Sequence, residues 1–75
     1  MPKRHSVLTA FGLNVRRQRE VRKLTQEALA EKAGLHPTYV SGIERGIRNP
    51  SLVIIARTAK ALGITVSKLT RGIGK

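Results

Sequence analysis

The feature that most limits the fold of this chain is a pair of short helical patterns meeting at one glycine. The first pattern covers Gln26–Ala33, and Thr25 before it can act as N-cap because its hydroxyl can accept a hydrogen bond from a first-turn amide. Gly34 is expected to end this helix, since a chain leaves a helix through positive φ at the lowest cost at glycine. Pro37 stands where a second helix begins, a position that tolerates proline. The sequence therefore predicts two helices joined by a tight turn.

Side chains at fixed offsets fit these two helices to each other. Val40 and Ile43 are predicted to face inward from the second helix, and the small side chain of Ala30 lets this helix cross closely over the first. Together with the turn glycine, this is the spacing of a helix-turn-helix unit, whose second helix can enter the major groove of DNA. The alternative is an ordinary helical hairpin in a small bundle.

The charge balance favours the first interpretation. Fifteen lysines and arginines stand against four acidic residues, for a net charge of +11. Such an excess repels itself and is most simply explained by a polyanionic partner, although charge alone would fit DNA, RNA or an anionic membrane. No apolar run approaches the roughly 18 residues of a membrane span, and there is no cysteine to form a disulfide or bind a metal. We expect a cytoplasmic protein without a membrane partner.

Chain length and periodicity predict one compact all-α domain of five helices. Residues 1–6 are expected to be a flexible basic arm, residues 7–71 the folded domain and residues 72–75 a loose tail. Ser6 or Thr9 is expected to cap the first helix, and a close helix contact would explain Gly12. The other helices are expected at about Leu8–Arg22, Pro37–Arg45, Leu52–Leu62 and Val66–Arg71, and the inward residues of the fourth at Leu52, Ile55, Ala59 and Leu62.

Four segments of this chain, TQEALAEKAGL, YVSGIERG, RNPSL and AKALGI, resemble the Cro/repressor-type (XRE family) DNA-binding domain. The resemblance spans residues 8–71, and GLHPTYVSGIERGIRNPSL is similar to controller proteins of restriction–modification systems. It implies a lambda-repressor-like fold and a nucleoid-associated transcriptional regulator that binds an operator in double-stranded DNA as a homodimer. Two alternatives remain: a phage-type repressor or antitoxin regulator, and a non-specific DNA- or RNA-binding module.

The resemblance also assigns roles to individual positions. Thr38 and Ser41 offer only short hydroxyls to the bases, where many relatives carry glutamine, arginine or lysine, so we expect a large share of specificity to come from DNA shape. Tyr39 has packing against the preceding helix as an alternative role, and His36 has helix capping. The base-facing positions are Pro37, Thr38, Ser41 and Gly42, and the phosphate-contacting positions are Gln26, His36, Tyr39, Arg45, Arg48 and Asn49.

Two further expectations concern structure. Arg19 and Glu44 match positions where relatives join the first helix to the end of the third, so we expect an ion pair there. Apolar residues beyond one buried stripe suggest either extra core or a dimer interface, formed by Val53, Ile54, Val66 and Leu69. No nucleophile–base set, phosphate loop or metal-ligand spacing is present in the sequence, so we expect neither an enzyme nor a cofactor.

Overall fold

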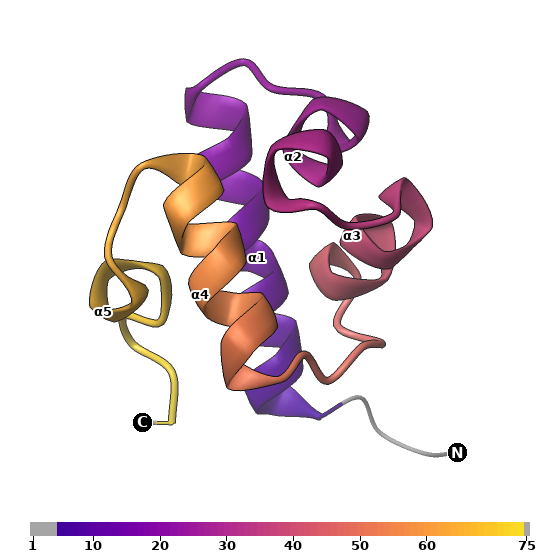
Figure 1. Cartoon of the computed structure of the whole chain (residues 1–75). Helices are drawn as coiled ribbons and strands as arrows, with labels where there is room; N and C mark the ends of the chain where they lie inside the picture. Colours follow the sequence, from indigo (N-terminus) through magenta and orange to yellow (C-terminus); the bar gives the residue numbers. More distant parts are fainter. Residues whose placement is uncertain (1–4, 75) are drawn as a thin grey trace.

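The computed structural model describes residues 5–74 and contains five helices. Helix α1 packs against α3 and α5, and α2 packs against α3 and α4, while α5 also contacts α4. In Figure 1, α2 and α3 lie on one side of the molecule and α5 lies on the other. The predicted all-α fold is confirmed, and no strand occurs in the described residues. No described helix has the length and apolar character that crossing a membrane requires. The helices are α1 (Ser6–Val21), α2 (Gln26–Ala33), α3 (Pro37–Glu44), α4 (Leu52–Leu62) and α5 (Val66–Leu69).

Local sequence signals set most of the helix ends. The Thr25 hydroxyl accepts a hydrogen bond from the Ala28 amide at 3.0 Å, and the Ser51 hydroxyl accepts one from the Ile54 amide at 3.2 Å. Gly34 leaves α2 with φ of 70°, in the left-handed region. The expected cap of α1 is wrong: Ser6 is already helical, and His5 precedes the helix without a side-chain cap.

The core lies between the five helices, and each of them contributes to it. Its buried members are Phe11, Val15, Leu29, Ala30, Val40, Ile43, Ala59, Leu62 and Leu69. One expected core residue, Leu52, is 71% exposed. The reason is that Leu52 lies on the outer side of the first turn of α4, whereas Ile54 and Ile55 of the same turn pack against the core.

Gly12 brings α1 directly against the end of α3, as the sequence suggested. A Cβ atom built on Gly12 would lie only 2.7 Å from the carbonyl oxygen of Glu44 and would also collide with the carbonyl oxygen of Ile43. No side chain can separate the two backbones here. The position of α3 relative to α1 is therefore fixed by contact between main chains.

One side chain of α1 binds the C-terminal segment through two hydrogen bonds. The Asn14 amide nitrogen donates to the carbonyl oxygen of Leu69 at 2.9 Å and to that of Arg71 at 3.1 Å. Ile73 then packs against the core, so the expected loose tail is wrong at this residue. Most of the expected basic arm lies outside the described residues, and Ser6 belongs to α1.

Candidate nucleic-acid interface

Helix α3 has one buried and one outer face. Val40, Ile43 and Glu44 are buried against the rest of the domain, which leaves Thr38 and Arg45 exposed on the opposite side of the helix. Pro37 and Ser41 are half-buried at its margin. α3 lies at the edge of the molecule, away from α5 (Figure 1). This arrangement leaves the outer face of α3 accessible to a long, rigid partner such as a duplex.

His36 caps the first turn of α3. Its ring Nδ1 accepts a hydrogen bond from the Thr38 amide at 3.2 Å, and Pro37 follows as the first helical residue. Of the two roles weighed for His36, the structure contains the cap. Because Nδ1 serves the helix, a phosphate contact by His36 would have to use the opposite side of the exposed ring.

Gly42 lies on the outer side of α3 but is covered by another side chain, so the base contact predicted for it would require that side chain to move. The side chain of Arg48, from the loop after α3, lies across it and buries it. A Cβ atom on Gly42 would be 2.6 Å from Arg48 Cγ and 3.1 Å from Arg48 Nε. The surface of α3 at this position is thus made by an arginine that does not belong to the helix.

Tyr39 packs against the core, in agreement with the packing role weighed for it. Its ring also faces Arg48, whose guanidinium carbon is 5.6 Å from the ring centroid. A cation over an aromatic face at an exposed site stabilises the arrangement by about 0.5–1 kcal/mol. Arg48 is therefore held at two points, by Gly42 along its stem and by Tyr39 at its head.

Glu44 is the buried anchor of the unit. Arg19 donates to Glu44 Oε2 from Nε at 2.6 Å and to Oε1 from Nη2 at 3.0 Å, and the expected ion pair is present. The Glu44 side chain is only 3% exposed. The hydrogen bond to Glu44 raises the pKa of Arg19 above its usual value, against the opposing effect of burial. Arg19 also donates to the carbonyl oxygen of Leu24 at 2.8 Å, which fixes the turn before α2.

The side chain of Gln26 belongs to the same network. Its amide nitrogen donates to Glu44 Oε1 at 3.0 Å. One N–H of this group is therefore engaged by Glu44, and the phosphate contact predicted for Gln26 would have to use the second N–H. Sequence reasoning missed this bond, since only the fold brings α2 and the end of α3 together.

The remaining expected phosphate contacts surround the C-terminal end of α3. Arg45, Arg48 and Asn49 are all exposed there. Ile47 between them is 51% exposed, so the loop presents mixed apolar and cationic surface next to the helix.

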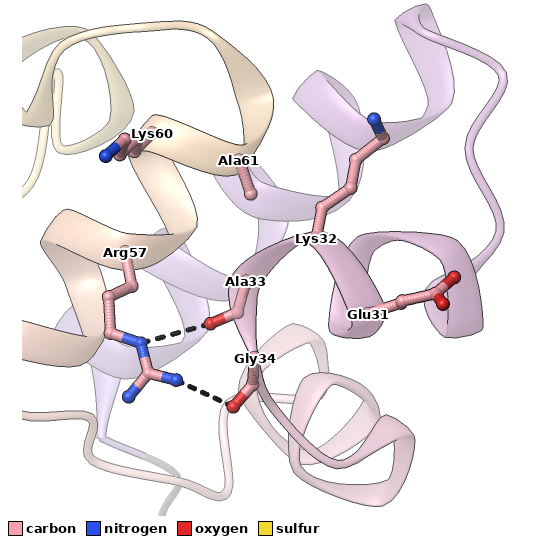
Figure 2. A pocket seen from close by; sticks show the side chains of 7 residues that line it. All are labelled: Glu31, Lys32, Ala33, Gly34, Arg57, Lys60 and Ala61. Atoms are coloured by element: carbon pink, nitrogen blue, oxygen red, sulfur yellow. Dashed lines mark hydrogen bonds between the residues drawn. The ribbon is translucent and has the colours of Figure 1, made fainter.

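A depression beside α2 has a structural role instead (Figure 2). Arg57 donates to the carbonyl oxygen of Ala33 at 3.1 Å and to that of Gly34 at 2.7 Å. It thereby satisfies carbonyl groups at the end of α2. Lys32 and Glu31 point away from Arg57 in Figure 2, so the charged side chains of this depression do not converge on a common point. Among the described residues, no group of histidines and acids could hold a metal ion.

The structure removes one residue from the set expected at a dimer interface. Leu69 is completely buried in the core and cannot contact a second chain, because α5 packs it against α1 and α4. Val66 is half-buried against the same core, as is Ile54. The exposed apolar residues of α4 are Leu52, at 71%, and Val53, at 66%.

Comparison with known proteins agrees with this geometry. Residues 15–69 match the sequence profile of the helix-turn-helix family. Control protein C.SmaI of Serratia marcescens is 48% identical over 56 residues, which are 75% of this chain and 67% of that protein. The immunity repressor of Bacillus phage phi105 is 48% identical over 58 residues, covering 77% of this chain and 40% of the repressor. The crystal structure of the restriction–modification controller protein C.AhdI from Aeromonas hydrophila superposes with a TM-score of 0.85 at 45% identity, covering 87% of this chain and 98% of that one.

Proposed function

The chain belongs to the XRE-type helix-turn-helix family of DNA-binding transcriptional regulators, and we propose that it controls the operon of a restriction–modification system as a homodimer bound to an operator. The observation that carries this proposal is the division of α3 into a buried face and an outer face flanked by cations. The role requires neither a cofactor nor catalytic activity. It places the protein in the cytoplasm, at the nucleoid.

In the proposed complex, the outer face of α3 enters the major groove. Thr38 and Ser41 hydroxyls reach base edges, and Pro37 and the Thr38 methyl group contact thymine methyls. Arg45, Asn49 and the free side of the His36 ring contact phosphates and set the orientation of the helix. Short side chains alone give weak direct readout, so DNA shape supplies a further part of the specificity.

Binding by two copies of the chain would compensate for the weak base readout of a single copy. A symmetric dimer would place its α3 helices in successive major grooves about 34 Å apart, and linking two weak sites raises the overall affinity. The exposed side chains of Leu52 and Val53 at the start of α4 support an interface there, with half-buried Ile54 beside them.

The test is exchange of both short hydroxyl side chains. First, sites selected from random duplex DNA by the wild-type protein define the operator. Thr38→Ala combined with Ser41→Ala should then lower the ratio of operator to random-DNA affinity by at least about tenfold, because base contacts carry the specificity. The slope of log affinity against log salt should change little, since phosphate contacts remain.

Ser67→Ala is the matched control, because Ser67 is exposed and belongs to α5, which lies on the other side of the domain from α3 (Figure 1). If the double variant keeps the wild-type ratio of operator to random-DNA affinity, another segment of the chain reads the bases. A wild-type ratio below about 10³ over random DNA would instead indicate a non-specific nucleic-acid module.

The similarity to the phage immunity repressor supports a second candidate, a repressor of the phage type. Both candidates bind an operator, and they differ in the genes that the operator controls. Mapping the selected site onto the genome decides between them. A site upstream of genes for a methyltransferase or nuclease supports the controller, whereas a site among phage genes supports the repressor.

A further inference from the structure

Gly42 leaves a gap between the side chains on the outer side of α3, and the aliphatic part of the Arg48 side chain fills this gap. The distances from an added Cβ atom would be 2.6 Å to Arg48 Cγ, 3.1 Å to Nε and 3.4 Å to Cδ. All three atoms belong to Arg48, so most of the length of this side chain lies against Gly42. A methyl group on residue 42 would therefore displace the Arg48 side chain from its present position.

The course of Arg48 has a consequence for the surface of α3. The residue follows the helix in sequence, yet its side chain returns across Gly42 to the ring of Tyr39, one turn earlier, with its guanidinium carbon 5.6 Å from the ring centroid. Arg48 is exposed as a whole, and its side chain forms no ion pair among the described residues. The guanidinium group therefore lies over Tyr39, the residue after Thr38, as an accessible cation.

We propose that Gly42 is a positioning residue for DNA binding, whose missing side chain seats Arg48 against Tyr39 so that the guanidinium group meets the duplex together with α3. The proposal rests on the proposed function, because it assumes that α3 is the helix that contacts DNA. In this proposal, Gly42 affects the affinity for DNA only by setting the position of Arg48.

The chemistry of the substitution makes the proposal testable. In Gly42→Ala the obstructed atoms belong to a flexible, exposed side chain, so Arg48 moves and the helix does not. Alanine favours an α-helix over glycine, so the melting temperature should stay the same or rise. A loss of DNA affinity without a loss of stability is a result that damage to the fold would not produce.

A double-mutant cycle gives the decisive measurement. Affinity for the selected operator is determined for the wild type, Gly42→Ala, Arg48→Ala and the combined variant at one salt concentration. We expect Arg48→Ala to weaken binding by about 5- to 100-fold, the range for one lost arginine contact with DNA. Gly42→Ala should weaken binding by at least about threefold, and the combined variant should bind no more weakly than Arg48→Ala alone.

Two results would overturn the proposal. One is an unchanged affinity of Gly42→Ala. The other is an equal loss from Gly42→Ala whether or not Arg48 is present, which would show that the methyl group obstructs DNA directly. Arg17→Ala removes the same charge from an exposed position on α1 and should weaken binding less than Arg48→Ala. If the wild-type protein selects no operator, the proposed function is wrong. If it selects an operator but the effects of Gly42→Ala and Arg48→Ala simply add, only the role proposed for Gly42 is wrong.

Discussion

Arg19 on α1 and Glu44 at the end of α3 are joined by two hydrogen bonds, although 25 residues separate them in sequence. The same carboxylate accepts a third hydrogen bond, from Gln26 at the start of α2. Three helices therefore meet at one buried acidic side chain. Its removal would leave the Arg19 guanidinium with low exposure and with only the carbonyl oxygen of Leu24 as partner.

Glu44→Ala is expected to lower the free energy of unfolding by about 3 kcal/mol, because removal of one member of a buried pair strands the other charge. Urea titration followed by circular dichroism measures this loss. Glu20→Ala is the matched control, since the Arg16–Glu20 pair is more than half exposed and should contribute under about 1 kcal/mol. A loss below about 0.5 kcal/mol in Glu44→Ala would contradict the prediction.

Gly12→Ala is expected to destabilise the domain by about 2–3 kcal/mol, because the added methyl group meets main-chain atoms of α3 that cannot move independently. Thermal and urea unfolding provide the measurement. Gly42→Ala is the control of identical chemistry, since its methyl group meets only a flexible side chain. Equal stability of the two variants would show that α1 can shift away from α3 at little cost.

Asn14→Asp is expected to release the segment after α5. The carboxylate has the shape of the amide but cannot donate to the carbonyl oxygens of Leu69 and Arg71, and it places negative charge against both. We expect a loss of about 1–3 kcal/mol in the free energy of unfolding, together with faster amide exchange in residues 69–73. Asn49→Asp, at an exposed loop position, should change neither quantity appreciably. Exchange rates that stay at the wild-type level would argue against the tether.

Val53→Asp is expected to convert the proposed homodimer to monomer, because it places charge in the apolar surface at the start of α4. Sedimentation at micromolar concentration gives the mass of each species. Val21→Asp is the control, because Val21 is 76% exposed on α1 and lies outside the proposed interface. Both substitutions should leave the stability of the protomer within about 0.5 kcal/mol. A wild-type protein that is already monomeric, or a Val53→Asp protein that still dimerises, would exclude this interface.

Short-range sequence signals were sufficient to predict most helix ends. Thr25 and Gly34 act within one turn of their own positions, so their roles can be read without the fold. Gly12 was also recognisable, because a glycine inside a helix suggests a close contact. The pairing of Arg19 with Glu44 came from family resemblance alone, since no local pattern links two residues so far apart.

The contacts that sequence reasoning missed depend on the tertiary arrangement or on the course of a loop. Asn14 reaches residues 55 and 57 positions later, and Arg57 reaches back 23 and 24 positions. Arg48 is only six positions from Gly42, but its direction depends on the loop between them. Leu69 was misassigned because a periodic pattern identifies the apolar side of a helix without showing whether the domain or a partner covers it. Tertiary arrangement, which periodicity does not contain, decides each of these cases.

The anchoring of α3 also bears on how such a protein can change over evolutionary time. Val40, Ile43 and Glu44 hold the helix in place, and none of them lies on the side that carries Thr38 and Arg45. Substitutions on that side need not weaken folding, so a lineage could acquire a different recognition sequence through a few exchanges on an otherwise constant scaffold. Duplicated copies of one gene could then diverge in target without first having to regain stability.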